Sequence, residues 1–219
     1  MDLRPIVKKE NIYRERMGIT SLLSIDDARK KAAILENIIS QVMIKLIYGN
    51  GHNYFKHGEN VAKHSIAIAK NLGMSRIDIC NIGYIALLHD IGKMQIPQYL
   101  LDKSTPNSTV EKMVLQNHPY TGKRLMMDQF TYIGDVLLCH HERLDGSGYP
   151  IGLKSDRIPY DSKIIAVADV YDGMVGKRNY QPQKTPLEAA DYLVKNKGKL
   201  FDEEIVNVFL SHLRRTGQI

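Results

Sequence analysis

The chain has 219 residues, a length that suits one well-filled domain or one domain with a short extension. A hydrophobic fraction of 43% and a charged fraction of 25% are ordinary for a globular protein and argue against global disorder. The formal net charge of +6 fits an anionic small molecule at least as well as nucleic acid, because long Lys/Arg runs and interleaved aromatic and basic residues are missing.

Targeting and cysteine signals are weak. No apolar run approaches the roughly 20 residues that span a bilayer, and the N-terminus Met-Asp-Leu-Arg-Pro lacks the pattern of a signal peptide. We therefore expect a cytoplasmic protein. Cys80 and Cys139 fit neither a metal spacing nor a disulfide framework, and both lie in apolar runs, so we expect them to be buried small hydrophobes.

The N-terminal part differs from the rest. Residues 1–24 carry scattered charge without a period, whereas apolar residues recur at helical spacing over 25–47 and Gly49-Asn50-Gly51 ends that pattern. The broad apolar face of this helix suits packing on the core or on a second copy of the chain. We expect residues 1–50 to be an arm and helix, for dimerisation or as a linker to a sensor, and residues 51–219 to be the main domain.

The main domain predicts helices almost throughout. Gly73 ends the first helix, Asp78 begins the next, Ser108 or Thr109 caps another, and Pro159 opens a later one. The predicted helices cover 57–72, 78–90, 110–118, 120–128, 131–141, 160–175, 186–196 and 202–214. Strand-like alternation is scarce, so the predicted fold class is all-α, with irregular segments around Pro97–Ser108 and Asp145–Pro150.

Ligand-type side chains end three apolar runs. Ile82–Leu88 runs into His89-Asp90, Val136–Cys139 into His140-His141, and Ile164–Ala168 into Asp169. Because a buried charge needs pairing or metal coordination, the repeated pattern predicts a metal site.

Histidines in two further places complete the candidate set. With His57 and His118 the candidate ligands are His57, His89, Asp90, His118, His140, His141 and Asp169. Imidazole and carboxylate together suit Fe, Mn or Zn. Adjacent helical residues point roughly 100° apart, so a His-Asp or His-His pair can serve two neighbouring ions, and we assign the bridging role to Asp90. Individually, each histidine has a plainer interpretation as a satisfied core residue, and Asp169 as a helix cap or a partner of Lys93; we assign no metal role to His52, His64 or His212.

These motifs resemble a known family. His89-Asp90-Ile91-Gly92-Lys93, followed by His140-His141-Glu142-Arg143-Leu144-Asp145-Gly146-Ser147-Gly148-Tyr149-Pro150, is similar to the HD-GYP branch of the HD-domain phosphohydrolases, over about residues 55–210. The resemblance implies an HD-domain helical bundle with extra C-terminal helices. It also implies hydrolysis of cyclic di-GMP, a bacterial second messenger, to the linear dinucleotide pGpG and sometimes onward to GMP.

The resemblance further implies roles for individual residues. One metal, Fe or Mn, would take His57, His89, Asp90 and Asp169; the second would take Asp90, His118, His140 and His141. Lys93 matches a lysine that contacts the scissile phosphate, and Arg178 a ligand-binding arginine. Gly148, Tyr149 and Pro150 match a loop that shapes the site near the nucleotide and serves partner recognition.

Two positions depart from the family pattern. Asn53 stands where some members have a Glu that binds a third metal, which predicts a two-metal site. Gln181 stands where the family has a lysine, which weakens the expected phosphate binding unless Lys184 compensates.

The expected mechanism is metal-assisted hydrolysis. Two ions bridged by Asp90 would present a hydroxide in line with the phosphorus, since a metal lowers the pKa of bound water to about 7. Lys93 and the ions would stabilise charge on the non-bridging oxygens. The plainer interpretation of Lys93 is a surface cation. Asp172, one turn after Asp169, either orients a ligand histidine or caps and is solvated.

Three alternatives stay open. In the first, the chain is a cyclic dinucleotide receptor with weak or no turnover, an alternative that Asn53 and Gln181 favour. In the second, it is a phosphodiesterase for a mixed GMP–AMP cyclic dinucleotide. In the third, it is an interaction protein that works through the Gly148-Tyr149-Pro150 loop and the 25–47 helix.

Overall fold

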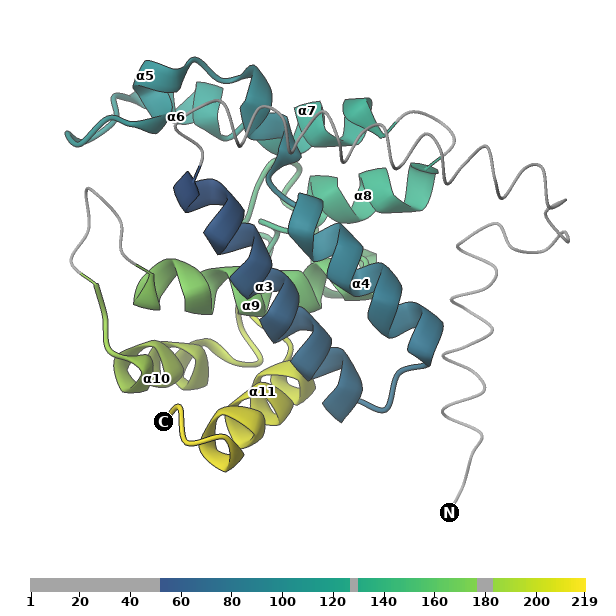
Figure 1. Cartoon of the computed structure of the whole chain (residues 1–219). Coiled ribbons are helices and arrows are strands. Elements are labelled where there is room, and N and C mark those ends of the chain that lie inside the picture. Colours follow the sequence, from purple (N-terminus) through teal and green to yellow (C-terminus); the bar gives the residue numbers. More distant parts are fainter. Residues whose placement is uncertain (1–51, 127–129, 177–182) are drawn as a thin grey trace, which may run out of the picture. The chain divides into compact units, whose positions relative to one another are not determined.

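The computed structural model describes residues 52–126, 130–176 and 183–219 (Figure 1), with the side chains of 52–55 left out. The arm and the 25–47 helix predicted at the N-terminus lie outside these residues, and so does the proposed division near residue 50. Arg178 and Gln181 lie outside them too, as does the side chain of Asn53.

The described part is helical, as the sequence predicted. It contains no strand, only isolated bridges between Asp145 and Lys154 and between Lys197 and Phe201. The elements are α3 (His52–Asn71), α4 (Arg76–Leu88), η1 (Ile91–Gln95), α5 (Gln98–Leu101), α6 (Thr109–Leu115), α7 (His118–Leu125), α8 (Thr131–Cys139), η3 (Ser155–Arg157), α9 (Tyr160–Val175), α10 (Pro186–Asn196) and α11 (Glu203–Arg215). None of the described helices is both long and apolar enough to cross a membrane.

Helix α3 is central to the packing and contacts α4, α9 and α11 (Figure 1). Val61 and Ile68 of α3, Ile164 of α9 and Phe209 of α11 are all fully buried. Burying each such side chain contributes about 1.5–3 kcal/mol. The other packing unit joins α7 to η1 and α8. Together these contacts hold the end of α4, the start of α7 and the end of α8 near α3 and α9.

Local sequence explains where most helices begin. Ser108, one of the two predicted caps, begins α6: its side chain accepts the Glu111 N–H while the Glu111 carboxylate accepts the Ser108 N–H, which makes a capping box. Pro159 precedes α9, and Asp202 caps α11. Helix α4 begins two residues earlier than predicted, because Ser75 is its cap and Asp78 occupies the third position of the first turn.

One burial prediction is wrong. Cys139 is buried, as expected, and burial raises the pKa of its thiol to about 12. Cys80, however, is exposed. The buried face of α4 includes Ile82, and a residue two positions away points roughly 200° around a helix. Cys80 therefore lies on the opposite side, although the local run is apolar.

Candidate metal centre

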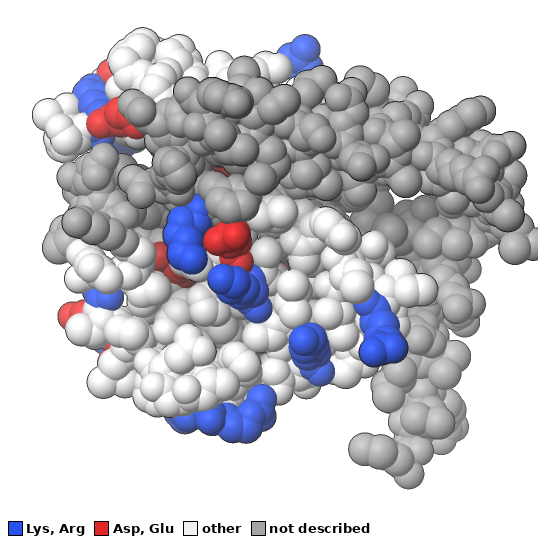
Figure 2. Space-filling view, viewed as in Figure 1, with Lys and Arg blue, Asp and Glu red and all other residues white. Residues whose placement is uncertain are grey.

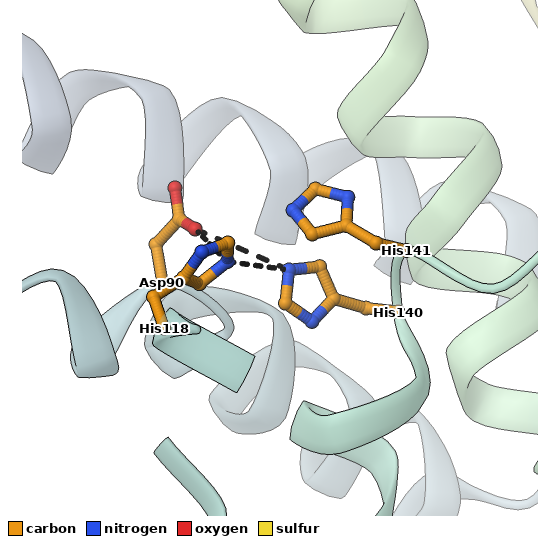
Figure 3. Close-up of side chains that lie close together, drawn as sticks. All are labelled: Asp90, His118, His140 and His141. Atoms are coloured by element: carbon orange, nitrogen blue, oxygen red, sulfur yellow. Dashed lines mark hydrogen bonds and ion pairs between the residues drawn. The ribbon is translucent and has the colours of Figure 1, made fainter. Parts of the chain in front are cut away.

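The predicted ligand residues converge from five places in the fold. His57 lies on α3, His89 and Asp90 follow α4, His118 begins α7, His140 and His141 follow α8, and Asp169 lies within α9. Their donor atoms form two groups, each with all atoms within 4.8 Å of one another. One group contains Asp90, His118, His140 and His141 (Figure 3), and the other contains His57, His89 and Asp169.

Asp90 lies between the two groups and turns one oxygen to each. Its Oδ2 is 3.4 Å from His89 Nε2 and 3.9 Å from His57 Nε2. Its Oδ1 is 3.2 Å from His118 Nε2 and 4.0 Å from His140 Nε2. This is the arrangement that a carboxylate shared by two cations requires.

Asp169 also faces both groups. Its Oδ1 is 3.1 Å from His57 Nε2 and 3.9 Å from His89 Nε2, while its Oδ2 is 3.7 Å from His141 Nδ1. The site therefore has two carboxylates among five imidazoles, and neither cysteine belongs to either group.

Three histidine rings are oriented by the backbone just before them in the chain. In each, Nδ1 lies beside the backbone carbonyl three residues earlier: His89 with Ala86 at 2.7 Å, His118 with Leu115 at 2.8 Å, and His140 with Leu137 at 2.6 Å. A carbonyl only accepts hydrogen bonds, so Nδ1 carries the proton in the neutral ring. Each Nε2 then turns a lone pair toward the site, as in a metal-ligating histidine.

A carboxylate orients the fourth ring. Asp172 Oδ2 lies 2.6 Å from His57 Nδ1, and Asp172 is buried. This contact matches the first of the two roles considered for Asp172, the orientation of a ligand histidine by a residue one turn after Asp169. His57 Nε2 is left facing Asp169 and Asp90.

Buried atoms at the centre need a partner that these side chains do not supply. His89 Nε2 and Asp90 Oδ1 are buried and accept no hydrogen bond from the described residues. The Nε2 atoms of His118 and His140 face each other at 3.4 Å. Leaving such a group unsatisfied costs about 1–3 kcal/mol. Several acceptor atoms therefore converge without hydrogen-bond donors, an arrangement that divalent cations would satisfy. The residues present thus fit a metal site.

Electrostatics favours most ligands in their metal-binding protonation states. Burial and the charges of His89 and His118 lower the pKa of His140 to about 3. Burial and the charge of His140 lower the pKa of His141 well below its usual value. Metal binding requires neutral imidazoles, and burial keeps His140 and His141 neutral.

The carboxylates are held ionised. Burial opposes the charge of Asp90, but Lys93 and His89 outweigh it and hold its pKa well below the usual value. Burial likewise opposes the charge of Asp169, which the hydrogen bond and charge of His57 outweigh. Burial alone would lower the pKa of His57, but Asp169 and Asp172 overcome it and raise that pKa to about 9. A proton on His57 thus balances part of the negative charge of the site.

The predicted substrate-binding residues are only partly described. Lys93 Nζ donates to Asp90 Oδ2 at 2.5 Å, and its side chain is 25% exposed, so it lies at the rim of the site. Tyr149 packs its ring on His141, with the centroids 4.6 Å apart. Gly148 and Pro150 flank it in the same loop. Arg178, as noted, is outside the described residues.

Sequence reasoning missed the role of Glu142. Its side chain is 2% exposed and accepts three backbone N–H groups, from Ile151 at 2.8 Å, Gly152 at 3.1 Å and Leu153 at 3.0 Å. An acidic residue placed directly between two histidines and a glycine-rich loop was the available signal. Its hydrogen-bond partners are backbone N–H groups, and these cannot be recognised from the residue types in the sequence.

Comparison with known proteins gives a consistent result. A model of the HD domain family matches residues 41–205. A cyclic di-GMP phosphodiesterase of Thermotoga maritima is 39% identical over 71% of this chain and 43% of its own length. A 3'3'-cGAMP-specific phosphodiesterase of Vibrio cholerae is 32% identical over 71% of this chain and 31% of its own. The chain therefore spans less than half the length of these relatives.

The fold also matches a solved structure. Bd1817, an HDG"Y"P protein from Bdellovibrio bacteriovorus, superposes with a TM-score of 0.62 at 20% identity, over 84% of this chain and 62% of that one. At this identity the likeness concerns the helical fold alone.

Proposed function

The chain belongs to the HD domain family, in its HD-GYP branch, and from this membership we propose that it is a metal-dependent phosphodiesterase that hydrolyses cyclic di-GMP to pGpG. The observation that carries the proposal is the position of Asp90 between the two ligand groups, with one carboxylate oxygen facing each. Relatives named as cyclic di-GMP phosphodiesterases support the choice of substrate.

We assign the seven ligands to two ions. His57, His89, Asp169 and Asp90 Oδ2 would hold one, and His118, His140, His141 and Asp90 Oδ1 the other. Oxygen and imidazole donors without a thiolate suit Fe or Mn. When bound, such ions lower the pKa of coordinated water to about 7 and neutralise charge on phosphate oxygens.

The remaining groups act on the substrate or on the ligands. Lys93, at the rim, is placed to donate from Nζ to a non-bridging phosphate oxygen, while Asp90 Oδ2 accepts from the same Nζ and holds it in position. Asp172 keeps His57 in the orientation that presents Nε2 to the site. We propose Gly148, Tyr149, Pro150 and Arg178 for nucleotide contacts, with the loop also available to a protein partner.

The charge distribution agrees with a small anionic substrate. On the face in Figure 2, Lys and Arg side chains of the described residues stand in separate small groups, some beside acidic residues, without one continuous basic stripe. Polymeric nucleic acid is recognised through extended basic surfaces, so this face offers it little.

The remaining parts of the proposal concern organisation. We propose that residues 51–219 form the catalytic domain, that the 25–47 helix serves a homodimer or a sensor linkage, and that the protein acts in the cytoplasm.

A second candidate substrate is a mixed GMP–AMP cyclic dinucleotide. Three relatives named 3'3'-cGAMP-specific phosphodiesterases are 30–36% identical to the chain, nearly as similar as several named for cyclic di-GMP. A third candidate, a receptor without turnover, rests on Asn53 and Gln181.

One experiment separates the candidates. The chain is purified without oxygen, its Fe and Mn content per chain is measured, and cyclic di-GMP and 3'3'-cGAMP are offered side by side with chromatographic detection of linear products. About two ions and pGpG support the first candidate, and faster cleavage of 3'3'-cGAMP supports the second. Two ions with bound dinucleotide and no product support a receptor. A folded chain without ions overturns all three.

A further inference from the structure

His141 is oriented differently from the other four site histidines. In each of the others, Nδ1 is hydrogen-bonded to an acceptor oxygen, either of a backbone carbonyl or of Asp172. For the His141 ring, the described residues provide no hydrogen bond, only the Asp169 carboxylate, whose Oδ2 is 3.7 Å from His141 Nδ1. Its ring instead stacks on Tyr149, with the centroids 4.6 Å apart and the planes inclined by 30°, and lies 4.0 Å from the His140 ring.

The backbone around the loop fixes where Tyr149 lies. The Tyr149 N–H donates to the His141 carbonyl at 3.3 Å. A Cβ on Gly148 would come within 2.5 Å of Glu142 Cα and of the Arg143 nitrogen, so only glycine allows this approach. The loop therefore lies directly on the backbone that follows His141.

Glu142 fastens the other end of the loop. Its Oε1 accepts the N–H groups of Ile151 and Gly152, and its Oε2 accepts that of Leu153. Charge-assisted hydrogen bonds of this kind are among the strong ones, and the carboxylate is buried with them. Glu142 thus ties together the two ends of the segment 142–153, and Tyr149 lies between these ends.

We propose that this segment, residues 142–153, is a positioning element of the metal centre: Glu142 anchors it, and the Tyr149 ring sets the orientation of the His141 imidazole in place of a hydrogen bond. The inference rests on the metal role proposed for His141 and adds Glu142 and Tyr149 as positioning residues. It also means that one face of Tyr149 is occupied, so a nucleotide or partner meets its other face or edge.

The test measures metal affinity instead of turnover. Tyr149→Leu removes the ring, Tyr149→Phe keeps it, and Tyr99→Leu changes a tyrosine that is 70% exposed and serves as the matched control. Glu142→Gln keeps one oxygen for two N–H groups but places an amide NH₂ against the third. Mn²⁺ binding is measured by competition with a chelator, together with the number of ions and the circular dichroism of each variant.

The expected order follows from the contacts. Losing a group that orients a ligand typically weakens metal binding 10–100-fold, so Tyr149→Leu should lose affinity by about that factor at one of the two ions. Tyr149→Phe and Tyr99→Leu should match the unsubstituted chain, because the Tyr149 hydroxyl makes no hydrogen bond to the described residues. Glu142→Gln should fall between. Its near-isosteric side chain keeps the test decisive even if Tyr149→Leu does not fold.

Three results would overturn the inference. They are a folded Tyr149→Leu that binds Mn²⁺ as tightly as the unsubstituted chain, a Glu142→Gln that does so, and a Tyr149→Phe that binds as weakly as Tyr149→Leu. A chain that binds no Mn²⁺ at all removes the inference together with the metal centre. A chain that binds two ions, shows the expected order and cleaves no cyclic dinucleotide keeps the inference and loses only the proposed reaction.

Discussion

The Nε2 atoms of His118 and His140 lie 3.4 Å apart, and neither can give the other a proton while both rings are neutral. The Nδ1 of each donates to a carbonyl on its own side, of Leu115 and Leu137. Two lone pairs therefore meet in a buried place, beside the equally unpartnered Asp90 Oδ1. His118 begins α7 and His140 follows α8, and the packing of α7 on α8 holds the two rings in this unfavourable arrangement.

The first prediction concerns metal and stability. A cation that binds the folded chain and not the unfolded one stabilises it by about 2.7 kcal/mol when its free concentration is 100 times the dissociation constant. We expect Mn²⁺ to raise the unfolding temperature and a chelator to reverse the change. In His140→Ala most of this response should vanish. Thermal unfolding followed by circular dichroism measures it, with Asp191→Asn on the exposed face of α10 as the control. An equal response in His140→Ala would contradict the assignment.

The second prediction concerns the contact between Asp172 and His57. In Asp172→Asn the imidazolium loses an anionic partner at 2.6 Å, so the pKa of His57, raised to about 9, should fall. The ring also loses a strong orienting bond, and metal affinity should drop about 10–100-fold. NMR titration of the metal-free chain reports the pKa, and chelator competition reports the affinity.

Asp191→Asn again provides the comparison, since it removes the same charge from an exposed position on α10. If the pKa of His57 stays near 9 in Asp172→Asn, then Asp169 alone keeps the imidazole protonated, and the orienting role proposed for Asp172 is wrong.

Much of the fold was predictable because its signals are local. Pro159 before α9, Gly73 after α3 and the Ser108 capping box each act within one turn of chain. Cys80 was misjudged because an apolar neighbourhood in sequence does not say which way one residue faces. The helical period, applied from Ile82, would have placed it outside.

The convergence of the site is a different kind of prediction. The residue pattern predicted a metal site that includes His57 and Asp169, but only the match to HD-GYP motifs implied that these two residues, more than a hundred positions apart, bind the same ion. The two-sided placement of Asp90 follows from packing of η1 on α7, which no pattern in the sequence reports. The role of Glu142 was not predicted for a similar reason, because its partners are backbone N–H groups that the fold of the loop brings to it.

The third prediction uses a buried acid outside the metal centre. Asp161 of α9 is fully buried, and burial raises its pKa from 3.8 to about 7. Between these values the folded chain binds more protons at this group than the unfolded chain does. The free energy of unfolding therefore falls as pH rises from about 4 to about 7, and levels off above.

Asp161→Asn removes this dependence while its amide oxygen can still accept the Tyr132 hydroxyl, 3.1 Å away. A shift of about 3 pKa units corresponds to about 4 kcal/mol, an upper limit for the gain. In urea unfolding without metal, the variant should be more stable than the unsubstituted chain at pH 8, with the difference shrinking toward pH 4. A variant that is less stable at pH 8 would show that the carboxylate has partners worth more than its burial costs.

The last prediction compares two glycines that face each other across the contact of η1 with α7. A Cβ on Gly92 would overlap the His118 carbonyl oxygen and lie 2.7 Å from the Gly122 nitrogen, both rigid backbone atoms. A Cβ on Gly122 would meet Ile91 and Leu137 at ordinary distances of 3.6 and 3.8 Å. Overpacking costs about 1–3 kcal/mol, and more where backbone must move, whereas alanine in a helix gains about 0.5–1 kcal/mol over glycine.

Gly92→Ala should therefore destabilise the chain by at least about 3 kcal/mol, or force η1 away from α7, while Gly122→Ala should be neutral or stabilising. Moving η1 carries Asp90 away from His118, so any folded Gly92→Ala protein should also bind Mn²⁺ more weakly. Urea unfolding and chelator competition on both variants measure the two effects. Equal stability of the two would mean that η1 and α7 do not approach so closely. Asp90 would then lack the packing that turns its Oδ1 toward His118 and His140.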